Sequence, residues 1–551
     1  MLKGLTIQNF KAFKEEQNIP IRPITLIFGE NSSGKSSIIH SLLYNKEAYN
    51  KRDANINTTQ ISGDTVELGG EREFIFGKEG IGSVFSMGFE YEQTRRNQFP
   101  FEPETSTSII SIKPMRMMFS SSISLLKSDI KVDNVDLMTH LVHIDDKSIA
   151  AGSYPILFEK INYNHPCMKK FIDTKFEEIK DLNSDSSVGF TKKMLEKGIS
   201  EYLEFIQIDY FGGSVPKYRI GHDRLKSYWK KSDKSSIEQL VSENVLEHFL
   251  IFCRSFTKDL ESILNSIIYL GPFRYYPPRH FYVQEMKKSL NWLSSGGDSW
   301  RALLENESLR NKVNMWLSDK HRLDIPYRWV ARKMFSDRDI KYLLNTFFDL
   351  REEYGITTDE YDPDNKEDNY AFLHQEELDA IPQEIIDELY STSPISGGEK
   401  GVPELMLEDI NTGTILSHKE VGIGISQVMP VIVRAIDSEK KIVCIEEPDI
   451  HVHPGLQARL GDVFIESALV NKNTLILETH SEHLLLRLLR RIKEGYEASN
   501  DQKFTSNDLS VIYTKKENGI SKAIEMEVDK KGKFKGNWPK DFFDERSKEL
   551  F

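Results

Sequence analysis

Alternating and helical spacings of apolar residues predict strands and then a helix in the first 50 residues. Residues 2–10 form a first strand, and the charged segment Lys11–Gln17 turns into a second one. Ile24–Phe28 is a short apolar run that favours a buried strand. Ser37–Leu43 has helical spacing, and the predicted helix extends to about Asn50.

The rest of the chain mixes strand and helix patterns and shows neither an internal repeat nor a sustained heptad pattern. The acidic stretch 352–392 predicts an exposed loop or a pair of surface helices. A closing pair of strands is predicted near 509–513 and 523–528. Other predicted strands are 63–70, 81–92, 108–112, 121–126, 137–144, 267–270, 442–446 and 474–478, and predicted helices are 171–179, 237–268, 297–350 and 428–436.

The segment between the third apolar run and the helix has a phosphate-binding pattern. Residues 29–36 read G-x-x-x-x-G-K-S, and a strand before and a helix after are the context that this motif needs. The glycines allow a tight turn whose N–H groups face phosphates, and the helix N-terminus adds positive dipole character. We expect Lys35 at the β- and γ-phosphates and the Ser36 hydroxyl on Mg²⁺. The residues predicted to contact nucleotide are Asn31, Ser32, Ser33, Gly34, Lys35, Ser36 and Ser37. The alternative is a surface turn that matches the pattern by chance.

Two later apolar strands end in groups that suit phosphate chemistry. The strand 442–446 delivers Glu446 and Glu447 at its carboxyl end, where ligand sites form in α/β sheets. Glu446 is a candidate Mg²⁺ ligand beside Ser36, and Glu447 is placed to orient or activate an attacking water. His480 follows the strand 474–478 and is predicted to sense the γ-phosphate. A strand that ends in a charged turn is the alternative.

Two segments are candidates for a signature loop that would complete the site from a second subunit. The segment 393–400 contains S-G-G-E, but a predicted hairpin follows it where a helix is required. The segment 421–427 contains glycines and a serine and runs directly into a predicted helix. We therefore expect Gly424, Ser426 and Gln427 to act in trans, and we treat Ser396 as a decoy.

Composition narrows the class of protein. The chain has 551 residues, which predicts two or three domains, and a net charge of −13, which disfavours wholesale binding to nucleic acid. Three scattered cysteines give neither a zinc pattern nor a disulfide framework and suit a reducing cytoplasm. No apolar run is long enough to cross a membrane. Aromatic and basic residues mix at 228–234 and 322–333, where nucleic-acid contact competes with an ordinary solvated surface.

Other residues suit simpler interpretations. Gly271-Pro272 should end the strand at 267–270 and present Arg274 at its end. His451 and His453 flank the turn after Pro448, and without a third ligand they give only a weak indication of metal. We interpret them as part of a loop between subunits.

The phosphate loop, the signature at 421–427, the acidic strand at 442–449 and the histidine strand at 474–480 resemble ABC-type ATPases of the SMC/RecF/OLD group. Several stretches also resemble the PtuA-type ATPases of Septu and retron-associated phage defence. They are 24–37, 269–274, 421–430, E-P-D-I-H-V-H-P at 447–454, E-T-H-S-E-H-L-L-L-R at 478–487, and the tail at 536–545.

This resemblance implies more than the residue patterns do. It implies ATP and Mg²⁺ as cofactors and a homodimer in which two heads enclose ATP, with Lys35 and Ser36 facing Ser426 of the other copy. It also implies a partner nuclease of the HNH, PtuB type, and a reverse transcriptase with its RNA–DNA hybrid in retron systems. Relatives often carry Gln at the position of Glu447, so a Glu here favours turnover. The residues after His480 are too few for a Toprim nuclease, so we expect no nuclease activity in this chain.

The expected fold is an α/β, P-loop ABC-type ATPase head of two lobes with inserted accessory regions. We expect an N-lobe at 1–95, an inserted α/β region at 96–265, a strand return with a helical insertion and acidic loop at 266–395, and a C-lobe at 396–551. The expected function is an ATP-gated scaffold that regulates a partner nuclease in antiviral defence. The alternatives are a RecF-like repair ATPase that binds DNA directly, and a nucleotide-binding platform without turnover.

Overall fold

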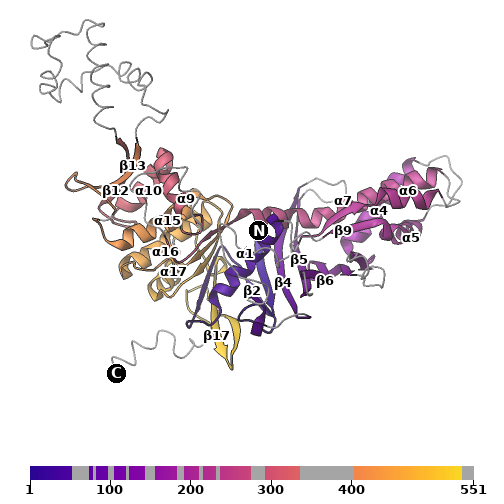
Figure 1. Ribbon diagram of the computed structural model, residues 1–551, viewed down its shortest axis with the longest axis horizontal. Helices are drawn as coiled ribbons and strands as arrows, with labels where there is room; N and C mark the ends of the chain where they lie inside the picture. Colours follow the sequence, from indigo (N-terminus) through magenta and orange to yellow (C-terminus); the bar gives the residue numbers. More distant parts are fainter. Residues whose placement is uncertain are drawn as a thin grey trace, which may run out of the picture. The chain divides into compact units, whose positions relative to one another are not determined.

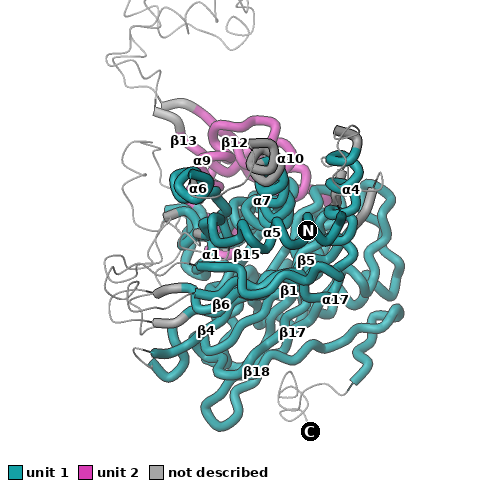
Figure 2. Tube along the Cα trace, turned by 90° about the vertical axis from the view of Figure 1, so that its right-hand side faces the viewer, with its two compact units in different colours: residues 1–275, 290–296, 427–551 teal, residues 276–289, 297–426 magenta. Residues whose placement is uncertain are grey.

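The computed structural model divides the chain into two compact units, which Figure 2 colours separately. Unit 1 comprises residues 1–275, 290–296 and 427–551, and unit 2 comprises 276–289 and 297–426. Helices and strands carry the labels of Figure 1. The structure describes residues 1–51, 74–78, 82–96, 105–118, 123–142, 156–182, 191–209, 215–230, 236–274, 292–334, 402–418 and 420–536.

Unit 1 contains a nine-stranded antiparallel sheet with the order β10-β9-β8-β7-β6-β5-β4-β1-β2. Only the β1–β4 pair joins strands that are not consecutive in the sheet's chain order. Asp133 and Asn134, both at positive φ, make the two-residue turn between β6 and β7. The strands are β1 (Leu2–Gln8), β2 (Gln17–Pro20), β4 (Val84–Arg96), β5 (Thr105–Met118), β6 (Ile123–Val132), β7 (Val135–Val142), β8 (Ile156–Ile161), β9 (Ile206–Asp209) and β10 (Lys217–Ile220).

A second sheet in unit 1 has six strands in the order β11-β15-β16-β3-β17-β18. All neighbours are parallel except β17 and β18, which form a hairpin. Every residue of β3, β15 and β16 is buried, as parallel strands covered on both faces require. The strands are β3 (Ile24–Gly29), β11 (Ile267–Leu270), β15 (Ile442–Glu446), β16 (Thr474–Glu478), β17 (Leu509–Glu517) and β18 (Ile520–Glu525).

Helix α1 (Lys35–Lys51) connects the cores of the two sheets. Its apolar side chains, including Ile38 and Leu42, belong to one buried cluster with residues of both sheets. Tyr44 meets Phe85 of β4 edge to face, with ring centroids 6.0 Å apart. The helix that begins at the phosphate loop is therefore held from both sides.

Four helices pack around the distal strands of the nine-stranded sheet: α4 (Pro166–Leu182), α5 (Lys192–Tyr202), α6 (His222–Trp229) and α7 (Ser236–Ser266). They lie together beside β9 in Figure 1. Phe171 of α4 meets Phe249 and Phe252 of α7, and α7 also contacts α1 and β4. Short 3-10 helices lie at η1 (Phe76–Lys78), η2 (Leu203–Phe205) and η4 (Ser506–Asp508).

Three helices accompany the C-terminal strands: α15 (Ile423–Asp437), α16 (Pro454–Leu469) and α17 (Glu482–Glu494). Ser481 caps α17 by accepting from the Leu484 N–H, and Gly495 ends the helix in the left-handed conformation. The buried Asp462 of α16 accepts from Arg487 and Arg491 of α17, which ties the two helices together.

Unit 2 contains α9 (Gly297–Glu305), α10 (Glu307–Ser318) and a sheet with the order β12-β13-β14. The strands are β12 (Tyr327–Met334), β13 (Val402–Asp409) and β14 (Ile415–Leu416). Trp300 of α9 packs edge to face on Trp329 of β12, with ring centroids 5.2 Å apart, and both side chains are fully buried.

Most predicted elements are confirmed, including the closing strand pair and the hairpin after residue 402, but helix over the whole of 297–350 is wrong. From Tyr327 the chain forms β12, in which Trp329 points inward while Arg328 and Arg332 pair with acids on β13. The two-residue alternation of these side chains is the strand signal that the helical interpretation missed. The predicted strand at 63–70, the acidic stretch 352–392, Ser396 and the tail beyond residue 536 lie outside the described residues.

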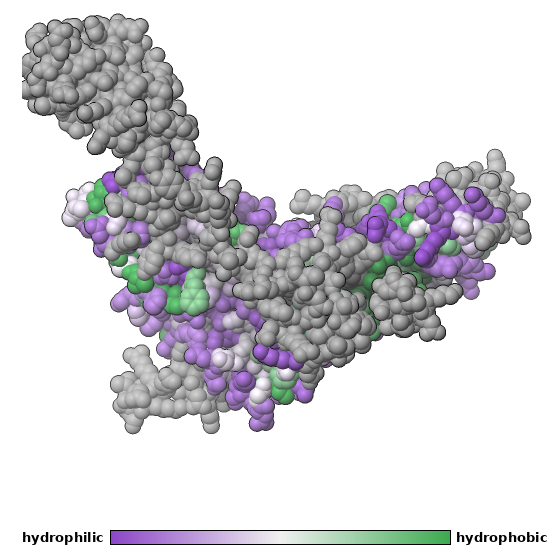
Figure 3. All heavy atoms as spheres, in the orientation of Figure 1, coloured by the Kyte–Doolittle hydropathy of each residue, from purple (hydrophilic) through white to green (hydrophobic). Residues whose placement is uncertain are grey.

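The compact units differ from the predicted division of the chain. Strands β5–β10 extend the sheet that begins with β1, so the segment predicted as an inserted region shares its core with the N-terminal strands. Among the described residues no helix is long and apolar enough to span a membrane. In the view of Figure 3, hydrophilic residues cover most of the described surface.

Candidate nucleotide-binding site

The phosphate loop lies between β3 and α1, as its sequence predicts. Gly29 has φ 153° and Gly34 has φ 99°, values that side chains strain to adopt. A Cβ on Gly29 would lie 2.2 Å from Thr514 Oγ1 of β17, and one on Gly34 would lie 2.8 Å from Ala12 Cβ. Neither glycine can be replaced without moving the loop, because its neighbours leave no room.

The Lys35 side chain is buried against the loop. Its Nζ donates to the carbonyl oxygens of Gly29 and Glu30 at 3.1 and 2.9 Å. Burial lowers the pKa of this ammonium, and the nearby carboxylates of Glu478 and Glu447 oppose that effect. The lysine thus lies at the loop with its positive charge held near two acids.

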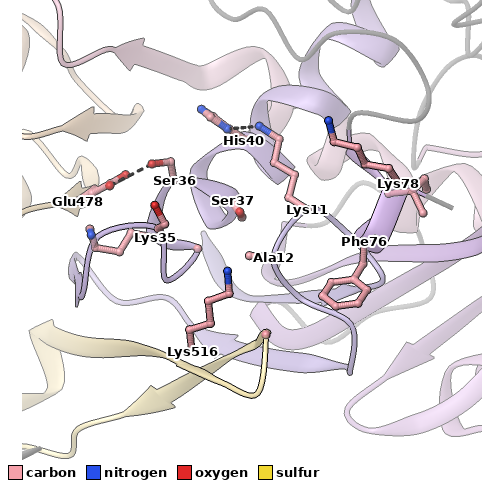
Figure 4. A pocket seen from close by; sticks show the side chains of 15 residues that line it. Lys11, Ala12, Lys35, Ser36, Ser37, His40, Phe76, Lys78, Glu478 and Lys516 are labelled. Atoms are coloured by element: carbon pink, nitrogen blue, oxygen red, sulfur yellow. Dashed lines mark hydrogen bonds between the residues drawn. The ribbon is translucent and has the colours of Figure 1, made fainter.

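Two buried carboxylates lie side by side at the carboxyl ends of β15 and β16. Glu446 and Glu478 are register partners, and each side chain is almost fully buried. Burial, reinforced by the charge of Glu446, raises the pKa of Glu478 to about 7, although a hydrogen bond from Ser36 acts in the opposite direction. Ser36 Oγ donates to Glu478 Oε1 at 3.0 Å, which Figure 4 marks with a dashed line.

These oxygens suit a hard cation brought by a nucleotide. Glu478 Oε2 is buried and has no hydrogen-bond partner among the described residues, so this oxygen can coordinate a cation. Within the same described ranges, no group of three or more His, Cys, Asp or Glu is arranged to hold a metal ion. Mg²⁺ needs no such cage, because it is usually held by one or two carboxylates together with phosphates and waters. Ser36, Glu446 and Glu478 therefore fit Mg²⁺ bound with ATP.

Glu447 and His480 lie at the rim of this site. Glu447 has φ 48°, which costs a non-glycine residue about 1 kcal/mol, and its N–H donates to the Glu478 carbonyl at 2.7 Å. His480 is exposed, and partial desolvation and the charge of Lys35 lower its pKa while Glu447 acts to raise it. The two predicted catalytic side chains thus share one electrostatic environment with Lys35.

Arg274 is buried beneath the strand ends, whereas the sequence predicted that it would be presented at the end of β11. Its Nη2 donates to the carbonyl oxygens of Glu446 and Glu447 at 2.6 and 3.1 Å, and burial lowers its pKa to about 10. The guanidinium therefore fixes the backbone that carries both acids. Its neighbour Phe273 is instead 87% exposed.

The predicted signature residues lie at the start of α15. The helix begins at Ile423, so Gly424 and Ser426 belong to its first turn, and Gln427 Nε2 donates to the Arg274 carbonyl at 3.2 Å. Ser426 is fully buried and its hydroxyl has no hydrogen-bond partner in the described part of the chain. A role for these residues toward a second copy stays a prediction, and it requires that the Ser426 hydroxyl becomes accessible.

A cavity of about 700 Å³ opens along the phosphate loop. Four lysines line it, from the β1–β2 turn, the loop, η1 and the β17–β18 hairpin, and Figure 4 shows them around one space. Only one carboxylate, Glu478, lies among the lining residues. The excess of positive charge suits a polyphosphate. The lysines are Lys11, Lys35, Lys78 and Lys516.

The other predicted loop contacts are distributed around this cavity. Ser32, Gly34, Lys35, Ser36 and Ser37 line it, whereas the Ser33 hydroxyl faces away and lies 2.6 Å from Thr514 Oγ1. Asn31 is exposed and does not line the cavity.

Sequence reasoning missed Glu478, Lys516 and the pair Lys11 and His40. Glu478 ends a buried strand just as Glu446 does, so the same pattern could have identified it. The others come from distant segments and carry no local signal.

The described parts of the two aromatic and basic segments make contacts within the fold, and residues 231–234 of the first segment lie outside the described residues. Tyr228, in the last turn of α6, packs on Tyr202 and Phe205, with ring centroids 6.2 and 5.2 Å away. In the second segment, Arg328 makes a bidentate salt bridge with Glu408, in which Nη2 donates to Oε1 at 2.7 Å and Nε donates to Oε2 at 2.8 Å. His453, which gave a weak metal signal, caps α16 by accepting from the Gly455 N–H.

Comparisons with solved structures give distant likenesses. The SmcHead bound to the C-winged helix domain of ScpA is 10% identical, with 96% of this chain and 98% of that chain covered and a TM-score of 0.35. The Smc head domain derived from Pyrococcus furiosus, bound to the C-terminal domain of ScpA, is 11% identical, with 96% of each chain covered and a TM-score of 0.34. The SMC head domain from Thermotoga maritima is 11% identical, with 96% and 99% covered and a TM-score of 0.33. No curated protein matches the chain.

Family comparison is more decisive. Residues 505–551 match a family described as a protein of unknown function, DUF3696. This segment of the chain includes the β17–β18 hairpin at the cavity. Residues 1–485 match the family described as AAA ATPase domain, and this match covers the phosphate loop and both carboxylate strands. Because this match spans well over half of a mixed α/β chain with a phosphate loop in the expected place, the chain belongs to the AAA ATPase domain family and is an ATP-binding ATPase.

Proposed function

We propose that this chain hydrolyses ATP with Mg²⁺ and that the nucleotide state of its site controls a partner protein. The observation that carries the proposal is the arrangement of Lys35 and Ser36 beside two buried carboxylates on adjacent strands. A cation-rich cavity beside buried acids suits a metal-bound triphosphate better than a simple anion, because the acids would repel an anion that lacks a metal.

In this proposal each residue has a distinct role. The Lys35 ammonium exchanges the carbonyl oxygens of Gly29 and Glu30 for phosphate oxygens of ATP. Ser36, Glu446 and Glu478 hold Mg²⁺, which supplies positive charge against the β- and γ-phosphates. Glu447 orients or activates the attacking water, and His480 contacts the γ-phosphate.

The proposed switch is the closure of two copies over ATP. Ser426 and its neighbours would complete the site of the other copy, and exposed Phe273 beside the strand ends would lie in the contact. Hydrolysis or loss of nucleotide would separate the heads and release or arm a bound effector, as order and interface switches driven by the γ-phosphate do. The resemblance to PtuA-type ATPases supports an HNH nuclease as that effector, with a reverse transcriptase and RNA–DNA hybrid in a retron system.

Direct DNA binding, the RecF-like alternative, gains no support from the described residues. In the first aromatic and basic segment Tyr228 packs on Phe205, and in the second Arg328 and Arg332 pair with glutamates. The net charge of −13 acts in the same direction.

Hydrolysis is tested by measuring phosphate release at saturating MgATP. We expect Glu447→Gln to lower kcat by about a hundredfold or more, as loss of a general base does, while ATP binding is retained. Lys35→Ala should abolish binding itself, and Glu307→Gln, a change at an exposed glutamate of α10, should alter neither. A Glu447→Gln variant with normal kcat would refute the catalytic role and favour a binding platform.

The partner is tested by a pull-down of the Glu447→Gln protein with ATP, with Lys35→Ala as the matched control. Mass spectrometry and nucleic-acid extraction are applied to the same eluate. An HNH nuclease captured only by the ATP-binding protein supports the switch. A homodimer that holds only DNA would overturn it and favour the repair ATPase.

A further inference from the structure

A chain of polar contacts runs behind the carboxylate of Glu446. Lys11 Nζ lies 2.6 Å from His40 Nδ1, and His40 Nε2 lies 3.3 Å from Glu446 Oε1. Tyr269 Oη donates to the same Oε1 at 3.0 Å. The three partners come from the β1–β2 turn, α1 and β11, so residues far apart in sequence converge on one oxygen.

The chemistry of these groups sets the direction of the hydrogen bonds. A lysine ammonium can only donate, so His40 Nδ1 accepts from Lys11 and carries no proton. A single ring proton on His40 then lies on Nε2, the nitrogen that faces Glu446 Oε1 at 3.3 Å. Lys11 therefore selects the tautomer that can hold the carboxylate.

Tyr269 Oη and His40 Nε2 both contact Oε1, and no described residue makes a hydrogen bond to Oε2 of Glu446. The carboxylate is thus held through one oxygen while the other is left for a ligand. Glutamate has one more rotatable bond than aspartate, so a metal-binding glutamate benefits more from being held in place. The Glu446 side chain is only 8% exposed and the His40 side chain 18%, which keeps water from competing for these bonds.

We propose that His40 is a positioning residue that, with Tyr269, orients Glu446 for Mg²⁺ and links that carboxylate to Lys11 at the wall of the nucleotide cavity. The inference rests on the proposed Mg²⁺-dependent ATP site and adds a residue to it. Lys11 and His40 both line the cavity, so nucleotide contact with Lys11 is transmitted through His40 to the metal ligand. Partners that orient metal ligands typically change metal affinity tenfold to a hundredfold when they are removed.

The test measures how much Mg²⁺ strengthens nucleotide binding. A fluorescent, slowly hydrolysed ATP analogue is titrated into the full-length protein, once in EDTA and once in MgCl₂, and the ratio of the two Kd values is the metal enhancement. His40→Leu removes both polar contacts of the imidazole. His40→Gln keeps an acceptor for Lys11 and a donor for Glu446. His248→Leu on α7, whose ring Nδ1 lies 2.8 Å from the Asn244 carbonyl oxygen of the same helix, is the matched control.

We expect His40→Leu to reduce the metal enhancement about tenfold or more, with a much smaller change of the Kd in EDTA. His40→Gln should restore most of the enhancement, and His248→Leu should leave it unchanged. Tyr269→Phe, which removes only the second donor, should give a smaller reduction and serves if His40→Leu unfolds. Melting temperatures separate folding defects from local effects.

Two results would overturn the inference. One is an unchanged metal enhancement in both His40→Leu and Tyr269→Phe. The other is a loss of binding in EDTA that equals the loss in MgCl₂, since that marks His40 as a general packing residue. A wild-type protein that shows no metal enhancement at all is a different result, because it refutes the proposed Mg²⁺ site itself.

Discussion

The burial of the Glu478 carboxyl predicts a pH dependence of the protein's stability, and its magnitude follows from the pKa of this group. In the metal-free protein its pKa is about 7, against an ordinary value of 4.5. The folded protein holds this proton more tightly than the unfolded chain. The contribution of Glu478 to the free energy of unfolding is therefore greatest below pH 4.5 and falls as the pH rises to 7. Above pH 7 the ionised carboxylate costs about 3 kcal/mol, at about 1.4 kcal/mol for each tenfold change in proton affinity.

Glu478→Gln removes that cost and keeps an acceptor for the Ser36 hydroxyl. We expect the variant to be more stable than wild type at pH 8, by up to about 3 kcal/mol, and nearly equal to it at pH 5. Thermal unfolding in EDTA, followed by scanning fluorimetry, measures the difference between the two melting temperatures at each pH. Titrating groups far from Glu478 cancel in this comparison because both proteins contain them in the same surroundings.

The control is Glu307→Gln, which removes an exposed carboxylate from α10. It should show no gain that appears only at high pH. A gain for Glu478→Gln of equal size at pH 5 and pH 8 would refute the reasoning, as would a loss at pH 8. Addition of MgATP should favour the wild type instead, because a bound cation compensates the charge that destabilises the metal-free protein.

Three further predictions concern the loop, a buried acid and an exposed ring. Gly29→Ala places a Cβ 2.2 Å from Thr514 Oγ1, so nucleotide binding by titration and the melting temperature should both fall. Asp462→Ala leaves two half-buried arginines of α17 without their carboxylate, so unfolding experiments should show a loss of about 3 kcal/mol. Phe273→Ser removes a ring that is 87% exposed, so light scattering should show weaker ATP-dependent dimerisation with unchanged nucleotide binding.

Each of these has a control and a contrary outcome. Gly198→Ala, at an open helical glycine of α5, should leave binding intact, and normal binding by Gly29→Ala would contradict the steric argument. The same truncation at the exposed Asp437, the last residue of α15, should be nearly neutral, and an equal loss there would argue against a special role for Asp462. Dimerisation of Phe273→Ser at wild-type strength would remove that ring from the proposed contact.

Local pattern was enough for the parts of the site that are continuous in sequence. Gly34, Lys35 and Ser36 lie where the motif predicts, because a strand, a tight turn and a helix N-terminus are all specified within about 20 residues. Glu446 and His480 end or follow buried strands, as their apolar runs indicate. The boundary of α15 differs slightly, since the helix already includes Gly424 and Ser426.

Other features depend on contacts that no local pattern encodes. Arg274 was expected to be presented at the end of its strand, yet it turns inward because two backbone carbonyl oxygens beneath the sheet edge need a donor. Residues 327–334 form a strand because β13 supplies partners from more than 60 residues away. The strands β5–β10 join the N-terminal sheet for the same reason, which moved the boundaries of the compact units.

The sequence by itself therefore determined the class of protein, the phosphate loop and the strands that carry its acids, because those signals are short-range and repeat with the geometry of strand and helix. Only the tertiary structure decided that Glu478 faces Ser36, that Lys516 lines the same cavity, and that Lys11 and His40 stand behind Glu446. Such contacts depend on sheet order and on the packing of α1, which bring together segments hundreds of residues apart.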